Sequence, residues 1–230
     1  MEKTSNNIPS NIKDLELMLE MLNNFVLTIK SIVDTKKEAS VLNFGSGDLK
    51  MTNLLLGEIE GNINFYCYDP IYSDDEKLKE YIATSKLSTL ENAEKGIILE
   101  YLKDKDKLDN KNFDLLISNF CFHHFLETDT EENLKKQIQS INPETIIISE
   151  YNMNGNINEE DFKKIFTNPQ ERAEVEEYKN DWKKLKDIHC KYNAKYYVEL
   201  LESIGYKIEN KENIQKSLNK FYLIAKRLTK

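Results

Sequence analysis

Residues 41–47 of the chain read Val-Leu-Asn-Phe-Gly-Ser-Gly, and this stretch decides the fold. The apolar run 41–44 is typical of a buried strand, and a helix-like run begins at Lys50. Between them stand Gly45 and Gly47. Glycine is needed where a backbone turns sharply or approaches a ligand without a Cβ in the way. A strand, a glycine turn and a helix in this order predict the start of a βαβ unit.

The same alternation continues along the chain. Apolar, β-branched runs predict further strands, and charged or amphipathic segments between them predict helices. The predicted strands lie at 64–70, from 97 onward, at 113–120, 145–150, 206–208 and 221–225, and the predicted helices at 75–90, 131–141 and 195–204. Strands that are apolar on both faces and alternate with helices form buried parallel sheets. The last two strands are joined by a connection too short for a helical crossover, so we expect them to pair antiparallel.

Two segments lie outside this alternation. Residues 11–34 predict one amphipathic helix, which either packs on its own domain or serves as a dimerisation face. Residues 152–195 are polar, with an amphipathic helix predicted at 171–188, and are expected to form a helical insert that covers the cleft as a mobile lid. The insert is too short for a core of its own, so we expect residues 1–230 to form a single domain. His189 falls in this insert and is expected at its surface.

Composition and charge restrict the class of protein. Apolar residues make up 40% and charged residues 31% of the chain, which is typical of a globular protein. No apolar stretch is long enough for a transmembrane helix, and the charged N-terminus is unlike a signal peptide, so we expect a cytoplasmic protein without a membrane partner. The net charge of −8 argues against nucleic acid as a partner. The three cysteines lack the spacing of a zinc site, so we expect structural thiols and no metal.

Polar residues follow several of the predicted strands. In an open α/β sheet, ligands bind at the carboxyl ends of the strands. Asp69 ends the second strand, 24 residues after Gly45, where a carboxylate can accept hydrogen bonds from both hydroxyls of a ribose. Together, the glycine turn and this acid predict a site for a cofactor that contains a nucleoside.

Four stretches of the sequence resemble class I S-adenosylmethionine-dependent methyltransferases. Val-Leu-Asn-Phe-Gly-Ser-Gly-Asp-Leu at 41–49 resembles their motif I, and Tyr-Cys-Tyr-Asp-Pro at 66–70 resembles their acidic second motif. Residues 112–124 resemble the fourth-strand motif, and 200–206 with 221–226 resemble the closing helix and the two terminal strands. The resemblance covers about residues 40–227 apart from 152–195. It implies a Rossmann-like α/β fold, with a seven-stranded, mostly parallel sheet whose last strand is antiparallel and with helices on both faces, and it implies S-adenosylmethionine as the cofactor.

Two positions depart from the family pattern. Asn43 stands where motif I usually has an acid that helps to orient the methionine end of the cofactor, and Leu49 stands where a third glycine is common. We expect Leu49 to narrow the approach at the first turn of the following helix. These departures leave open a methyltransferase-like subunit that binds cofactor or a partner without turnover. A nicotinamide-dependent oxidoreductase fits less well, because Lys50 occupies the position of the last glycine in G-x-G-x-x-G.

The resemblance assigns roles to individual residues by position. It assigns Asn43, Gly45, Ser46 and Gly47 to the methionine moiety, Asp69 to the ribose, Pro70, Ile71 and Leu102 to the adenine, and Asn119 and Phe120 to the reactive side of the cofactor. The candidate bases are His123, His124 and Glu150. Because adjacent side chains point in different directions, we expect at most one of the two histidines to face the cleft.

The acceptor is less well defined by the sequence. The candidate substrate contacts are Tyr151, Tyr178, Trp182 and Tyr196. The aromatic residues of the insert serve either to pack the lid on the body or to enclose a substrate. Five lysines between 183 and 195 form either a solvated face or a docking patch for an anionic substrate. Since the Asn-Pro-Pro-Tyr signature of many nucleic-acid methyltransferases is absent, a small molecule or a protein side chain is the expected acceptor. The oligomeric state stays open.

Overall fold

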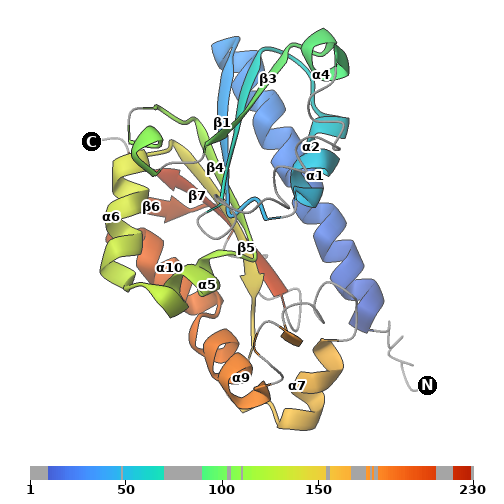
Figure 1. Ribbon diagram of the computed structural model, residues 1–230, viewed down its shortest axis with the longest axis vertical. Coiled ribbons are helices and arrows are strands. Elements are labelled where there is room, and N and C mark those ends of the chain that lie inside the picture. The colour runs from blue at the N-terminus through green and yellow to red at the C-terminus, as the bar shows by residue number, and fades with distance from the viewer. Residues whose placement is uncertain are drawn as a thin grey trace, which may run out of the picture.

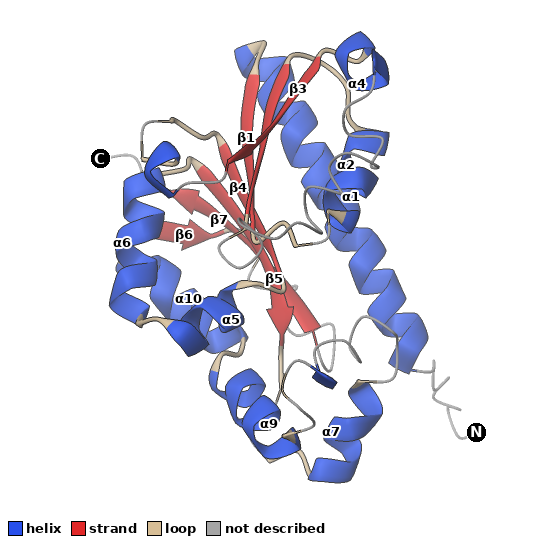
Figure 2. Ribbon diagram, in the orientation of Figure 1, coloured by secondary structure: helices blue, strands red, loops and turns tan. Residues whose placement is uncertain are grey.

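A seven-stranded sheet forms the centre of the molecule (Figure 2). The computed structural model describes residues 10–47, 49–69, 90–102, 105–109, 111–153, 156–166, 175–176, 178, 181–210 and 220–228. The strands are β1 (Ala39–Phe44), β2 (Ile63–Tyr68), β3 (Ile97–Leu102), β4 (Leu115–Asn119), β5 (Thr145–Tyr151), β6 (Tyr206–Ile208) and β7 (Lys220–Arg227), in the spatial order β3-β2-β1-β4-β5-β7-β6. Strands β1 to β5 pair in parallel, and β7 pairs antiparallel with both β5 and β6. The predicted α/β architecture, a seven-stranded and mostly parallel sheet with an antiparallel last strand, is confirmed.

Helices cover both faces of the sheet (Figure 1). Helices α1 and α2 pack over one face, and α5, α6 and α10 lie over the other. The bounds are α1 (Ser10–Lys36), α2 (Lys50–Glu58), α4 (Leu90–Glu94), α5 (Phe122–Thr128), α6 (Glu131–Ile141), α7 (Glu159–Ile165), α9 (Trp182–Lys191) and α10 (Ala194–Ser203), with a short 3-10 helix at Lys105–Lys107. The central strands β1, β4 and β5 are almost entirely buried on both faces because helices cover them, as their continuous apolar runs predicted.

Helix α1 packs on its own domain. Phe25 and Ile29 are buried against the sheet. The hydroxyl of Tyr222 on β7 donates to Glu20 Oε1 at 2.8 Å and accepts from Asn24 Nδ2 at 3.1 Å. These contacts join residues that are 198 and 202 positions apart in the sequence. They attach the first helix of the chain to its last strand.

The prediction of one continuous helix over 171–188 is wrong, because a helix begins inside this range at Trp182. Asp181 has a non-helical backbone, and its side chain accepts the backbone N–H of Lys184, so that α9 begins at Trp182. An aspartate in this position satisfies backbone donors that a helix leaves unpaired at its start, and it therefore marks a boundary. The predicted helix at 75–90 lies outside the described residues except for its last residue.

The described part of the insert lies where β5 ends (Figure 1). Helices α7 and α9 contact each other there, and α9 also contacts α5. Phe162, Phe166 and Leu185 are buried, and they belong to the same hydrophobic cluster as the residues under α5 and α10. The insert therefore shares the core of the main domain, while its mobility stays a prediction. Among the helices of the described residues, none is long and apolar enough to cross a membrane.

Candidate functional site

The glycine turn after β1 is tied to the end of β2. Gly45 and Gly47 both have positive φ angles, +76° and +50°. The backbone N–H groups of Gly45 and Ser46 donate to the carbonyl oxygen of Tyr68 at 2.7 and 3.2 Å. A Cβ built on Gly45 would lie 2.0 Å from the Sγ atom of Cys121, whereas a Cβ on Gly47 would have no described atom within 4 Å. Gly45 is thus required for packing, and Gly47 has no close neighbour among the described residues.

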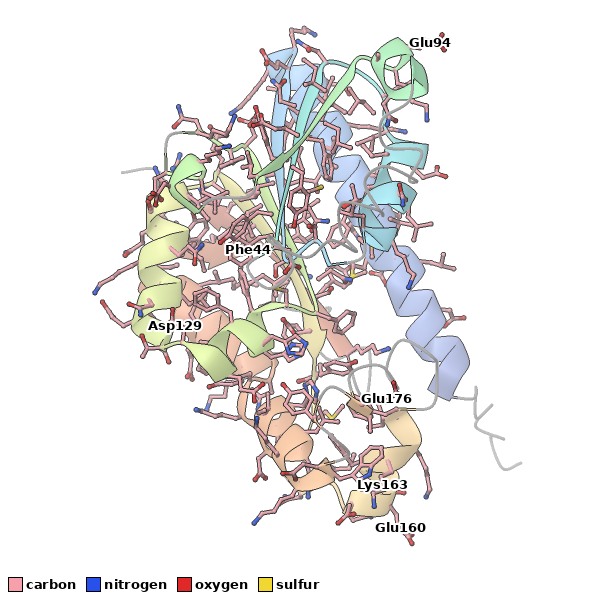
Figure 3. All side chains as sticks on the ribbon, viewed as in Figure 1. Phe44, Glu94, Asp129, Glu160, Lys163 and Glu176 are labelled. Atoms are coloured by element: carbon pink, nitrogen blue, oxygen red, sulfur yellow. The ribbon has the colours of Figure 1, made fainter. Side chains whose placement is uncertain are left out.

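Asp69 meets this turn, as the spacing predicted. It follows β2 directly, is only 4% exposed, and its Oδ2 atom accepts the backbone N–H of Gly47 at 2.7 Å. A carboxylate and a glycine turn from neighbouring strands therefore lie in direct contact at the carboxyl edge of the sheet. Phe44, the last residue of β1 before the turn, is labelled in Figure 3.

Asn43 faces α2. Its Nδ2 atom donates to Thr52 Oγ1 at 2.8 Å, and Thr52 Oγ1 lies 3.6 Å from the Sγ atom of Cys67. Its Oδ1 atom is buried and has no hydrogen-bond partner among the described residues. The amide thus joins β1 to α2 beneath the turn.

The expectation that Leu49 narrows the approach to the turn is wrong. Leu49 is 1% exposed and belongs to the hydrophobic cluster under α1 and α2. Its backbone is left-handed, with a φ angle of +62°, and this residue immediately precedes α2. The unusual conformation turns the side chain into the core instead of toward the turn.

On β3, Tyr101 pairs with Cys67 of β2, so it lies level with Asn43 of β1. Leu102, predicted beside the adenine, is fully buried in the hydrophobic cluster under α5 and α6. Successive strand residues point to opposite faces, so Tyr101 takes the other direction. Burial raises the pKa of the Tyr101 hydroxyl, and the charge of Asp69 raises it further, while Ser46 and the Asp69 backbone act in the opposite sense. Pro70 and Ile71 lie outside the described residues.

Asn119 and Phe120 end β4 beside β5. Asn119 Oδ1 accepts the hydroxyl of Ser149, and the Phe120 N–H donates to the Ser149 carbonyl at 2.9 Å. Phe120 has a left-handed backbone with a φ angle of +51°, a strained conformation of the kind that clusters at functional sites. Its ring lies 4.9 Å from that of Tyr151, and the Lys220 Nζ atom lies over both rings at 5.5 and 5.8 Å.

Glu150 and His123 form a buried pair. Both side chains are 1% exposed, and His123 Nδ1 lies 2.6 Å from Glu150 Oε2. Glu150 Oε1 accepts the backbone N–H groups of Cys121, Phe122 and His123 at 3.0, 2.8 and 3.4 Å. The carboxylate therefore holds the start of α5 with one oxygen and orients the imidazole with the other. Because both oxygens are engaged within the protein, Glu150 positions the histidine and does not itself face an acceptor as a base.

The rings of the two adjacent histidines lie close together, and whether either faces an acceptor stays a prediction. Their ring centroids are 4.0 Å apart, because α5 begins at Phe122 and both imidazoles lie over its first turn. His124 is half-buried and stacks with Tyr178 at 6.2 Å. The Tyr178 hydroxyl donates to Glu127, which also forms an ion pair with Lys184.

The prediction that His189 lies at the surface is wrong. His189 is 1% exposed, and its ring centroid is 4.7 Å from His123 and 4.2 Å from Tyr151. Phe166 stacks on it at 5.6 Å. The sequence gives one local signal for this burial. His189 stands four residues after the buried Leu185 on α9, so both lie on the same face of the helix.

The remaining predicted substrate residues pack within the protein. Trp182 meets Phe166 edge to face at 6.3 Å. Tyr196 packs on Tyr192 at 4.9 Å, and its hydroxyl donates to Glu131 at 3.0 Å on α6. Their contacts favour packing of the insert on the body over a substrate enclosure. A surface groove of about 440 Å³ lies between α5 and α9. It is lined by three lysines, three acids and three largely apolar residues: Leu126, Glu127, Asp181, Lys183, Lys184, Asp187, Ile188, Lys191 and Tyr192. The described part of the chain holds no cluster of ligands for a metal ion.

Comparisons with known proteins agree with this fold. No protein-family model matches the chain, and no curated protein matches its sequence. Among solved structures, the chain is similar to the methyltransferase domain of bacterial CtHen1-C, with 16% identity, a TM-score of 0.56, and coverage of 93% of this chain and 100% of that one.

Two further structures show the same arrangement. The 16S rRNA methylase ArmA has 13% identity and a TM-score of 0.51 over 93% of this chain and 85% of its own. A SAM-dependent methyltransferase from Aquifex aeolicus has 12% identity and a TM-score of 0.50 over 83% and 82%. At these identities the similarity shows the fold alone, which is that of class I methyltransferases.

Proposed function

We propose that the chain binds S-adenosylmethionine at the glycine turn and Asp69, and transfers its methyl group to an acceptor at the carboxyl ends of β4 and β5. The observation that carries this proposal is the 2.7 Å contact between the Gly47 N–H and Asp69. It joins a backbone turn and a ribose-binding acid in one place, on the fold that methyltransferases use.

The residues present fit an adenosyl group. None of the described atoms lies within 4 Å of where a Cβ on Gly47 would stand, which leaves room for a ligand to approach its backbone. Asp69 is held in place by the turn and presents a carboxylate at the strand end, where ribose hydroxyls are accepted in nucleotide-binding sheets. Asn43 Oδ1, buried without a hydrogen-bond partner among the described residues, lies beneath the same turn.

Most of the catalytic work falls to positioning. Bound S-adenosylmethionine would supply an electrophilic methyl group on a sulfonium sulfur. Asp69 and Gly47 would hold the ribose end, and Asn119 and Phe120 would line the reactive side. Phe120, Tyr151 and Phe166 exclude water there, since the three rings are packed into one continuous wall. Alignment of this kind is worth several orders of magnitude in rate.

His123 is the base that the geometry favours. Glu150 engages Nδ1, so a proton taken from an acceptor would go to Nε2. A buried carboxylate beside the imidazole stabilises the protonated ring that results. This arrangement suits an acceptor that loses a proton on methylation, such as a hydroxyl group, and Glu150 then acts as a positioning residue.

The acceptor is proposed to be a small molecule or a protein side chain. The net charge of −8 gives no general attraction for a phosphate backbone. The same fold is also found in a 16S rRNA methylase, so RNA belongs in the acceptor panel, and methylation of RNA alone would overturn this part of the proposal.

Calorimetric titration tests the cofactor assignment. The wild-type protein should bind S-adenosylhomocysteine and neither NAD nor NADP. Asp69→Ala should weaken the binding by about tenfold or more, because ribose hydroxyls without an acceptor cost about 1–3 kcal/mol. Asp114→Ala is the matched control, since Asp114 accepts the backbone N–H of Ser40 at the opposite edge of the sheet. Unchanged affinity in a folded Asp69→Ala protein would overturn the assignment.

A second candidate function is cofactor binding without turnover. Asn43 favours it, because this residue has no carboxylate to offer to the methionine end of the cofactor and its amide nitrogen is already bound to Thr52. Binding of S-adenosylhomocysteine without methyl transfer to any acceptor in the panel would support this candidate over the first.

A further inference from the structure

All three histidines of the chain gather where the insert meets the main domain. His123 and His124 stand in the first turn of α5, and His189 lies on α9, which contacts α5 (Figure 1). The ring centroid of His123 lies 4.0 Å from that of His124 and 4.7 Å from that of His189. The contact between the two helices therefore contains side chains of the type that titrates near neutral pH.

His123 and His124 both lie close to groups that can support a charge. Glu150 Oε2 lies 2.6 Å from His123 Nδ1, so a carboxylate stabilises a proton on this ring. His124 is half-buried, and its Nδ1 atom lies 3.4 Å from the hydroxyl of Tyr178, which donates to Glu127. Solvent and this acid can therefore support a charge on His124.

His189 is enclosed by rings. It is buried, and its ring centroid lies 4.2 Å from that of Tyr151 on β5. Phe162 on α7 and Phe166 at the end of α7 lie at 6.4 and 5.6 Å. The imidazole of His189 thus meets the titratable ring of His123 from α5, that of Tyr151 from β5, and apolar rings from α7.

Burial and charge both oppose a proton on His189 in the packed state. A charged imidazole there would give up its hydration, and it would lie 4.7 Å from the ring whose proton Glu150 stabilises. Lys186, one turn earlier on α9, adds a further positive charge. His189 stands in the last turn of α9, and the negative end of the helix offsets only part of this cost, because full burial of a charge is the larger effect.

We propose that the contact between His123 and His189 is a pH-sensitive latch, which holds α9 on α5 at neutral pH and releases it as the pH falls. Once α9 leaves α5, water reaches His189, and an exposed histidine takes up a proton below about pH 6.5. The open state then binds one proton more than the closed state, so a fall in pH favours opening. Opening would uncover His123, and its consequence for methyl transfer is the one part that rests on the proposed function.

Hydrogen exchange followed by mass spectrometry tests the latch. Peptides from α9 report opening of the insert, and peptides from β4 report unfolding of the sheet. In the wild type, the protection of α9, corrected for the intrinsic exchange rate at each pH, should fall by about tenfold or more from pH 7 to pH 5. The reason is that one proton changes such an equilibrium by up to about tenfold per pH unit. Protection of β4 should stay above that of α9 at both pH values.

His189→Gln and His189→Phe are the test variants. Neither side chain titrates in this range, and the two differ in shape, so a packing defect in one is checked by the other. The protection of α9 should be the same at pH 7 and pH 5 in both. His124→Gln is the matched control, because it removes another histidine of the same cluster and should keep the pH dependence of the wild type.

Several outcomes would overturn the latch. Protection of α9 in the wild type that stays level from pH 7 to pH 5 would do so. An equal fall in the His189 variants, or loss of the fall in His124→Gln, would show that a different group titrates. A fall that β4 shares to the same extent would identify unfolding of the whole domain, and no separate release of α9 would then exist.

Discussion

Alanine at Gly45 should destabilise the fold, whereas alanine at Gly47 should chiefly block the ligand. At Gly45 the new Cβ would lie 2.0 Å from Cys121 Sγ and 2.3 Å from Cys121 Cβ. Overpacking of this kind costs about 1–3 kcal/mol, and the left-handed backbone adds about 1–2 kcal/mol for a residue with a Cβ. The sum is about 2–5 kcal/mol for Gly45→Ala. Gly47→Ala carries only the backbone cost of about 1–2 kcal/mol.

Thermal unfolding followed by circular dichroism measures the difference. In a chain of this size each kcal/mol shifts the melting temperature by roughly 2–4 °C, so Gly45→Ala should melt roughly 4–20 °C below wild type and Gly47→Ala roughly 2–8 °C below. The order reverses in binding. Gly47→Ala should lose affinity for S-adenosylhomocysteine by at least about tenfold, since its methyl group enters the space that the ligand needs.

A double-mutant cycle identifies the cause. Cys121→Gly removes both atoms that the Gly45→Ala methyl group would strike, so the double variant should be more stable than the sum of the single effects by about 1–3 kcal/mol. Equal melting temperatures for the two alanine variants, or the absence of coupling with Cys121, would refute the packing argument.

Three further predictions concern buried groups and the insert. Glu150→Gln should lower the free energy of unfolding by about 1–3 kcal/mol in urea melts, because an amide binds His123 and the start of α5 more weakly than a carboxylate; an unchanged midpoint would contradict the pairing. Burial raises the pKa of Cys67 from 9.0 to about 12, so above pH 9 the unfolded state loses this proton while the folded state keeps it. Stability should then fall by about 1.4 kcal/mol per pH unit between pH 9 and 12, and Cys67→Ala should remove that part of the slope. Glu127→Ala should speed limited proteolysis within 152–195, since it removes the acceptor of Tyr178 from α5; cleavage at the wild-type rate would show that this contact does not hold the insert.

Several features of the glycine turn follow from the local sequence. Gly45 and Gly47 are required by positive φ angles directly after a strand, and a two-glycine turn in that place is visible in sequence. Asp69 follows the neighbouring strand, and parallel strands end at one edge of a sheet. The sequence thus places Asp69 at the same edge as the turn, and the structure adds that it accepts the Gly47 N–H.

Other features depend on contacts between distant segments. His189 lies against His123 because α9 packs on α5, and no pattern near residue 189 specifies which side chain it meets. Glu150 looked like a base in the sequence, and only the fold shows three backbone N–H groups directed at one of its oxygens. Tyr101 gains its position from the register of β3 on β2.

The sequence by itself determined the strands, the glycine turn and the parallel pairing in the sheet. These follow from side-chain periodicity and from backbone conformations that glycine tolerates. The tertiary structure alone decided that Leu49 turns inward, that His189 is buried, and that Cys121 closes the space beside Gly45. These outcomes depend on which surfaces meet across the core, and that choice minimises the free energy of the whole packed chain rather than of any segment within it.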